Sequence, residues 1–219
     1  MVFLWIDRSP SMWFTSGLAM EAKIDRALVL GLAAADLLVR GGERAGLLGL
    51  TPALAARNIV ERFAEALLAQ ESAAGYEPEE LPVRARLQRG ARVILIGDFI
   101  ADQAAIAAIT DSFSAYGVLG NLIMVADPVE ETFPFTGNTE FIDVDSPARL
   151  RAGQAEAFRQ EYIRRLALHR EAIAASARKH GWSLTLHRTD RPATEALLAL
   201  RVQLDANPGS FPHWQGAVR

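Results

Sequence analysis

The sequence contains no cysteine among its 219 residues, and this absence removes several kinds of chemistry at once. Without thiols the chain has no disulfides, no thiolate metal sites and no cysteine nucleophiles. The absence also fits a reducing compartment, so we expect a cytoplasmic protein. Four histidines are present, but no two of them have the spacing of a metal-binding pair on one helix.

Long apolar runs and strongly basic stretches are absent as well. The longest apolar run, residues 27–39, is interrupted by Asp36 and is shorter than the roughly 20 residues that a membrane-spanning helix needs. We therefore expect no membrane insertion by this segment. With a net charge of −3 and no basic patch beyond ordinary helix faces, nucleic acid is not an expected partner.

The usual signatures of nucleotide binding and serine hydrolysis are also missing from the sequence. It has no G-x-x-x-x-G-K-[ST] loop, no G-x-G-x-x-G after a strand and no G-x-S-x-G turn. Met1 leads directly into Val2-Phe3-Leu4 without a basic leader, so a signal peptide is not expected. A chain that opens directly on a core strand would fit a shortened protein, and the sequence leaves open whether a segment precedes it.

Half of the residues are apolar, and the length suits one globular domain with a large core. Apolar runs typical of strands alternate with segments of helical periodicity, which predicts a parallel sheet with right-handed crossovers. We predict an α/β domain over residues 1–205, with a mainly parallel central sheet and helices on both faces. Residues 206–219 are expected to form an irregular tail. The predicted strands are 2–6, 44–50, 92–97, 119–125 and 182–187.

The predicted helices separate these strands. Two regions break the alternation: residues 71–91 are expected to form a surface loop, and residues 127–149 carry several prolines around a short strand at 139–143. The predicted helices are 21–40, 55–70, 101–116, 147–180 and 192–205.

The most informative motif is the pentad Asp-Arg-Ser-Pro-Ser at residues 7–11, directly after the first strand. One carboxylate and two hydroxyls lie within five residues, where the chain must leave the sheet. These hard oxygen ligands suit Mg²⁺ or Mn²⁺. The alternative is that Asp7, Ser9 and Ser11 are ordinary turn and cap residues.

A second acid follows another buried strand and favours the metal-site interpretation. Asp98 comes directly after the apolar run 92–97, so Asp7 and Asp98 both lie at the carboxyl ends of predicted strands. Ligands of open α/β sheets bind at such ends, where the strand order reverses. If the two strands are neighbours, the two carboxylates meet at one site.

These residues resemble the von Willebrand factor A fold with its metal-ion-dependent adhesion site, in which D-x-S-x-S follows the first strand and a second Asp follows the fourth. More closely, the chain is similar to the bacterial domain-of-unknown-function family 58. The blocks that carry this resemblance lie at residues 4–12, 37–48, 93–99, 127–137 and 187–192.

The resemblance implies that Asp7, Ser9, Ser11 and Asp98 are metal ligands, and it implies a role beside MoxR-type AAA+ ATPases in the assembly or maturation of other proteins. Relatives of this kind carry an upstream segment, sometimes with membrane helices. The adhesion site normally includes a Thr from a later loop. The corresponding stretch, residues 79–84, has no hydroxyl, and the nearest Thr is Thr51, directly after the second predicted strand. We therefore expect weak metal binding.

Further residues belong to the same rim of the predicted sheet. Asp127 and Asp190 follow two more strands and would either add negative charge to the rim or cap the next turn, which we favour. Trp13 and Phe14 follow the pentad and would either form the edge of a partner-binding surface or pack the loop onto the domain.

Three functional hypotheses follow from this pattern. The favoured one is a non-enzymatic interaction module in which a carboxylate of a partner protein completes the coordination of a divalent cation. The second is a Mg²⁺-dependent phosphoryl-transfer or hydrolase enzyme, for which two acids and a hydroxyl around a metal would suffice in principle. The third is a structural domain whose metal site is degenerate.

Overall fold

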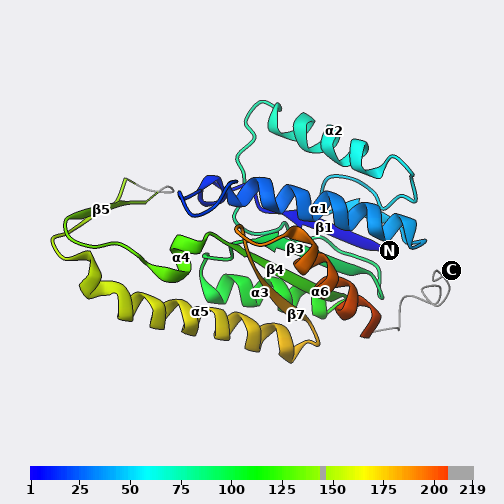
Figure 1. Cartoon of the computed structure of the whole chain (residues 1–219). Helices are drawn as coiled ribbons and strands as arrows, with labels where there is room; N and C mark the ends of the chain where they lie inside the picture. Colours follow the sequence, from blue (N-terminus) through cyan, green and yellow to red (C-terminus); the bar gives the residue numbers. More distant parts are fainter. Residues whose placement is uncertain (144–146, 207–219) are drawn as a thin grey trace.

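The computed structural model describes residues 1–143 and 147–206 and has a parallel β-sheet at its centre (Figure 1). The sheet has five strands in the order β2-β1-β3-β4-β7, and every neighbouring pair is parallel. The predicted fold class, a parallel sheet in a three-layer α/β domain, is confirmed. The strands are β1 (Val2–Ile6), β2 (Ala45–Leu47), β3 (Arg92–Gly97), β4 (Leu119–Ala126) and β7 (Ser183–Arg188).

Burial on both faces explains why the central strands are continuous apolar runs. All six residues of β3 are buried, and seven of the eight residues of β4 are buried. A strand that is covered on both sides gains from β-branched and aliphatic residues at every position, rather than at alternate ones. The apolar runs in the sequence therefore identified these strands correctly, with β2 shorter than expected because the chain turns at Gly49.

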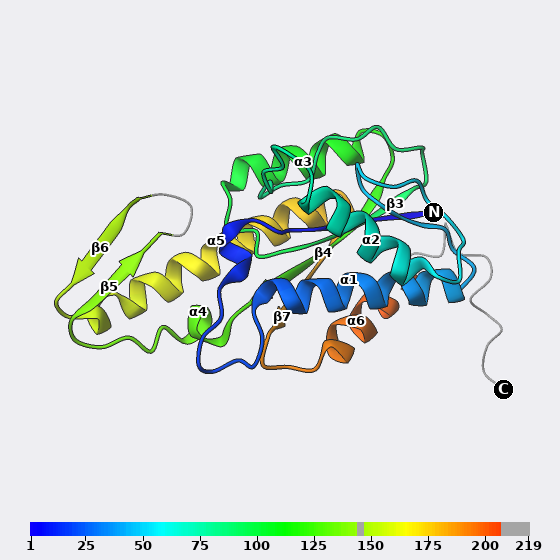
Figure 2. The ribbon, with the colours of Figure 1, turned by 90° about the horizontal axis from the view of Figure 1, so that it is seen from above.

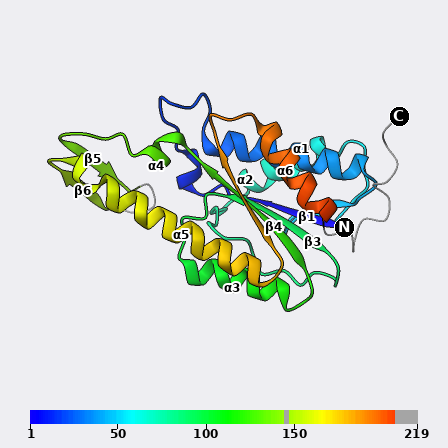
Figure 3. The same cartoon turned by 60° about the horizontal axis from the view of Figure 1, so that its bottom comes forward.

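Helices cover both faces of the sheet (Figures 2 and 3). One face packs against α1, α2 and α6, whose buried side chains meet Leu4, Ile94 and Ile123 of the sheet. The other face packs against α3 and α5, which enclose Val93, Leu95 and other strand residues. The helices are α1 (Lys23–Arg40), α2 (Ile59–Glu71), α3 (Gln103–Ser114), α4 (Pro128–Thr132), α5 (Arg159–Lys179) and α6 (Ala193–Ala206).

The long helix expected over residues 147–180 is wrong in its first third. Residues Arg149–Ala152 form strand β6, which pairs antiparallel with β5 (Thr139–Ile142), and α5 begins only at Arg159. The ladder satisfies backbone groups of both segments, and Gly153 follows the end of β6. Helix propensity of the Arg- and Ala-rich segment is too weak to override this pairing. The resulting hairpin projects beyond the sheet (Figure 2).

The remaining predictions concern loops and the end of the chain. Residues 72–91 contain no helix or strand, as expected for a surface loop. The short strand expected at 139–143 is β5. The tail predicted for residues 206–219 falls, beyond Ala206, outside the described residues. In the part of the chain that the structure describes, no helix is both long and apolar enough to cross a membrane.

Candidate metal-binding site at the carboxyl rim of the sheet

Strands β1 and β3 are neighbours, and this adjacency creates the candidate site. Their register pairs Ile6 with Ile96, so Asp7 and Gly97 follow side by side at the carboxyl end of the sheet. A Cβ on Gly97 would lie 2.8 Å from the Cβ of Asp7, so the Asp7 side chain uses space that only glycine leaves free. The order β2-β1-β3 also makes this the point where the strand order reverses, the usual place for a ligand.

The pentad folds into a tight turn that directs its hydroxyls toward Asp98. The backbone N–H of Ser9 donates to Asp7 Oδ1 at 2.9 Å, and a 3₁₀ turn follows over Pro10–Trp13. Met12, in that turn, is completely buried and anchors it to the core. The turn is therefore held both by a polar contact at its start and by an apolar contact in its middle.

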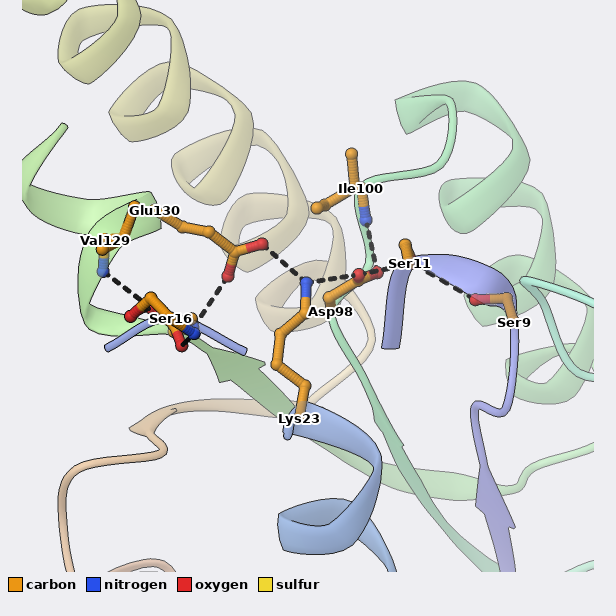
Figure 4. A network of polar contacts seen from close by, with 9 residues as sticks. Ser9, Ser11, Ser16, Lys23, Asp98, Ile100, Val129 and Glu130 are labelled. Carbon is orange, nitrogen blue, oxygen red and sulfur yellow. Dashed lines mark hydrogen bonds and ion pairs between the residues drawn. The ribbon is translucent and has the colours of Figure 1, made fainter. Parts of the chain in front are cut away.

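A chain of polar contacts connects the pentad to the loop after β3 (Figure 4). The Oγ atoms of Ser9 and Ser11 lie 3.2 Å apart, and Ser11 Oγ donates to Asp98 Oδ2 at 2.7 Å. The backbone N–H of Ile100 donates to Asp98 Oδ1 at 3.2 Å. Asp7, Ser9, Ser11 and Asp98 are thus brought together at one rim, although they come from two segments about 90 residues apart in sequence.

The loop after β3 adopts a strained conformation to achieve this arrangement. Phe99 has a φ of 51°, in the left-handed region that non-glycine residues rarely adopt. Its side chain is buried in the core on the α3 and α5 side, which holds the turn in place. Such strain, which costs about 1–3 kcal/mol, is typical of sites where the position of a neighbouring side chain matters.

Lys23, which the sequence analysis did not single out, is a central member of this site. Its Nζ lies 2.9 Å from Asp98 Oδ2 and 2.6 Å from Glu130 Oε1 (Figure 4). The side chain is 1 % exposed, although it belongs to the first turn of α1, where a positive charge opposes the helix dipole. Two carboxylates from other elements therefore compensate a cation that its own helix disfavours.

Burial and charge together shift the protonation of Asp7. Burial raises the pKa of Asp7 to about 7, against the lowering effect of the Ser9 hydrogen bonds, while nearby Asp98 raises it further. Burial pulls the pKa of Lys23 down, but Asp98 and Glu130 outweigh it, so that its pKa is raised and the ammonium is kept. Among the described residues, no basic side chain forms an ion pair with Asp7.

The residues present fit a hard cation in their chemistry. Ligand oxygens around an octahedral Mg²⁺ at about 2.1 Å are separated by roughly 2.9 Å. The contacts between Ser9 and Ser11 and between Ser11 and Asp98, at 3.2 and 2.7 Å, bracket that separation. No group of three or more His, Cys, Asp or Glu residues that could hold a metal occurs in the described ranges, so any cation here depends on the serine hydroxyls.

Thr51, the remaining candidate ligand, serves the turn after β2 instead. Its Oγ1 accepts a hydrogen bond from the backbone N–H of Leu47 at 2.8 Å, and its own N–H donates to Leu47 O at 2.9 Å. Within residues 1–143 and 147–206, Thr51 makes no hydrogen bond to any of the four rim residues. The structure therefore brings together four of the five predicted ligands. Thr51 does not supply the hydroxyl that the adhesion site normally takes from a threonine.

The two further acids of the rim have local partners. Asp127 is fully buried and caps α4, accepting from the backbone N–H of Val129 at 2.8 Å and from the Ser16 hydroxyl at 2.6 Å. Glu130 completes that cap by accepting from the Asp127 N–H, which also orients it toward Lys23. Asp190 binds Arg188 at 2.5 Å near the surface. The capping interpretation favoured for Asp127 matches this geometry.

Trp13 and Phe14 differ in their surroundings. Trp13 is 60 % exposed and lines an apolar hollow of about 470 Å³ between α1 and α2. Phe14 is 36 % exposed, with its ring 5.9 Å from Lys23 Nζ. Neither ring is buried, and both interpretations of this pair stay predictions.

Comparison with known proteins decides the family. The model of a family described as "Protein of unknown function DUF58" matches residues 1–172. The chain belongs to this family. The resemblance to this family is thus confirmed over residues 1–172, which include four of the five sequence blocks, and the structure shows the expected parallel sheet with flanking helices. The comparison with curated proteins finds no match.

One solved structure shares the fold at low sequence identity, and two others match with lower TM-scores. An aerotolerance-related membrane protein from Bacteroides fragilis NCTC 9343, solved with multiple mutations to serines, matches with a TM-score of 0.53 at 16 % identity, over 94 % of this chain and 98 % of that one. BatB from Bacteroides thetaiotaomicron gives a TM-score of 0.48 at 13 % identity, over 94 % and 97 %. The SpRpn10 VWA domain gives 0.46 at 12 % identity, over 100 % and 98 %.

Proposed function

We propose that this DUF58 domain is a non-enzymatic protein-interaction module that binds Mg²⁺ or Mn²⁺ through Asp7, Ser9, Ser11 and Asp98. A carboxylate of a partner protein would complete the coordination of the cation. The observation that carries the proposal is the chain of contacts that joins the Asp7 carboxylate, the two serine hydroxyls and the Asp98 carboxylate after two adjacent strands.

The electrostatics of the rim support a bound cation. Asp7 is 1 % exposed and lies near a second carboxylate, so its ionised form is disfavoured without added positive charge. A divalent ion would stabilise both carboxylates at neutral pH. Two carboxylates give limited charge, however, so we expect weak binding and a preference for Mg²⁺ or Mn²⁺ over Zn²⁺.

The surface beside the rim supports a protein as the partner. Exposed Trp13 and the apolar hollow between α1 and α2 would accept an apolar side chain next to the carboxylate that reaches the metal. The family resemblance implies a MoxR-type AAA+ ATPase as the partner to test. A second candidate function, a structural domain without a working metal site, is favoured by Lys23, because its ammonium already neutralises Asp98.

Calorimetric titration of metal-stripped protein with Mg²⁺, Mn²⁺ and Zn²⁺ tests the cation. We expect Mg²⁺ and Mn²⁺ to bind the parent, and Asp98→Asn, which keeps the shape of the side chain, to lose that binding. Capture of a purified MoxR-type ATPase should require the same cation and the same aspartate. Tight Zn²⁺ binding that persists in Asp7→Ala would contradict the proposal, as would partner binding that is unaffected by a chelator.

A further inference from the structure

A metal ion at the rim meets a cation that the chain itself provides, the ammonium of Lys23. Lys23 Nζ and the Ser11 hydroxyl both donate to the same oxygen, Asp98 Oδ2, at 2.9 and 2.7 Å. Each carboxylate oxygen offers about two acceptor sites. This oxygen is therefore fully used within the protein, and a metal ion that takes it must displace one of the two donors.

Of the two donors, the lysine is the one that a metal must move. A hydroxyl can turn its proton away and offer a lone pair to the ion, whereas an ammonium has no lone pair and repels a cation. Glu130 provides the place to which Lys23 can retreat, because Nζ already lies 2.6 Å from its Oε1. Glu130 is itself held by the cap of α4, where it accepts from the Asp127 N–H at 2.7 Å.

We propose that Lys23 is an intramolecular competitor of the divalent cation, and that it weakens the affinity of the rim by occupying Oδ2 of Asp98, the oxygen that also contacts Ser11. The proposal rests on the cation site proposed above. In the absence of metal, Lys23 bridges Asp98 and Glu130. When the metal binds, Lys23 keeps its ion pair with Glu130 and loses the one with Asp98. Metal binding at the rim and the Lys23–Asp98 ion pair therefore exclude each other.

The competition has a direct experimental signature. Free Mn²⁺ is measured by electron paramagnetic resonance during titration of the full chain, with Mn²⁺ alone as the probe. Lys23→Met keeps most of the apolar side chain and removes the ammonium, and it should bind Mn²⁺ at least tenfold more tightly than the parent. Asp98→Asn in the same background should remove the gain.

Arg170→Met is the matched control for net charge. Arg170 pairs with Glu131 at 2.8 Å, next to Glu130 on α4, and forms no hydrogen bond or ion pair with Asp98 among the described contacts. The substitution removes one positive charge near the same helix, so it should change the Mn²⁺ dissociation constant by less than about threefold, in keeping with screening of distant charges. An equal gain in both variants would overturn direct competition.

A second pair of variants covers the case in which Lys23→Met does not fold, because it leaves buried Asp98 and half-buried Glu130 without their cation. Lys23→Met/Glu130→Gln removes one of those charges as well, and it is compared with Glu130→Gln alone. The same tenfold gain is expected in this pair. Circular dichroism of each variant without metal identifies those that are folded.

The outcomes separate this inference from the proposed function. If the parent binds Mn²⁺ through Asp98 and removal of Lys23 leaves the affinity unchanged or weaker, the competitor role is wrong and the cation site stands. If only the Lys23 variants bind, the competitor role is correct and the parent does not use a cation. If neither parent nor Lys23 variants bind millimolar Mn²⁺, both proposals fail.

Discussion

Two buried residues, Asp7 and His187, make the stability of the protein depend on pH in opposite directions. The pKa of Asp7 is about 7 in the folded protein against 3.8 for an aspartate in water, mainly because of burial. Below pH 4 both states bind the proton. As the pH rises from about 4 to 7, Asp7 loses its proton in the unfolded chain but keeps it in the folded protein. The metal-free protein therefore loses stability over this range.

Asp7→Asn should therefore stabilise the metal-free protein at pH 8. The amide oxygen keeps the acceptor for the Ser9 N–H, and the buried charge is gone. We expect a gain of about 2–4 kcal/mol at pH 8 and almost none at pH 4, from urea unfolding in the presence of a chelator. Loss of stability in this variant at pH 8 would show that the charged form of Asp7 is structurally required.

His187 gives the opposite dependence on pH. The side chain is 4 % exposed, and burial, followed by the nearby charge of Arg26, lowers its pKa to about 4. Its Nε2 lies 3.3 Å from Arg26 Nη1, which suits a neutral ring that accepts a hydrogen bond. The unfolded chain takes up a proton as pH falls below about 6.5 and the folded state does not, so stability is lost between pH 6.5 and 4.

Removal of His187 should leave the effect of Asp7 uncompensated. Relative to the parent, His187→Gln should gain up to about 3 kcal/mol in the free energy of unfolding as the pH falls from 7 to 4. Because Asp7 and His187 act in opposite directions over the same window, the parent alone shows little net change. Unfolding of Asp7→Asn, His187→Gln and the double variant at both pH values separates the two, and an unchanged profile in His187→Gln would refute the assignment.

At the scale of elements, β3 determines both the core and the site. Ile94 in its middle is completely buried against α1 and α6. Ile94→Ala should reduce the free energy of unfolding by about 2–5 kcal/mol, the usual result of emptying a buried aliphatic site. Leu186→Ala on edge strand β7 removes a side chain of the same size that is 50 % exposed, and should cost less than about 1 kcal/mol.

Chemical denaturation of the two variants measures this difference. Equal losses would mean that the middle of β3 is not packed more tightly than the edge strand β7, against the burial described here. The rim itself should be unaffected by Leu186→Ala, since β7 is separated from β1 by β3 and β4. That variant is therefore also a control for metal binding.

Sequence reasoning succeeded where the local signal was strong. The five strands follow from their apolar runs, and the common position of Asp7 and Asp98 at strand ends follows from the same pattern. Adjacency of β1 and β3 was only a condition in the sequence argument, because strand order is set by crossovers that the sequence does not show locally. The long helix was wrong at residues 149–152, where pairing with β5 overrides propensity.

Lys23 escaped notice for a related reason. A lysine at the start of a helix is common, and its partners Asp98 and Glu130 lie 75 and 107 residues away in sequence. One signal would have pointed to it: a buried cation in the first turn of a helix opposes the helix dipole and requires acidic partners. That signal needs knowledge of burial, which the sequence alone did not provide for this position.

At the scale of the whole molecule, one edge of the sheet gathers the polar groups that its core excludes. Loops after β1, β3 and β4 and the start of α1 all contribute to this rim, through Ser11, Asp98, Glu130 and Lys23. The hairpin of β5 and β6 projects away from the body next to α5 (Figure 2). Because the polar groups gather at this rim and the apolar groups in the core, we expect substitutions in the two regions to act separately. Ile94→Ala tests the core and Asp7→Asn tests the rim.

The most direct test of the account is a crystal structure of the protein grown with saturating MnCl₂, with anomalous scattering recorded to locate manganese. We predict one anomalous peak within bonding distance of oxygens from Asp7 or Asp98 and the pentad serines, with Lys23 Nζ moved from Asp98 to Glu130 alone. A map without manganese at the rim, in which Lys23 still binds Asp98, would contradict the claim that this domain holds a divalent cation.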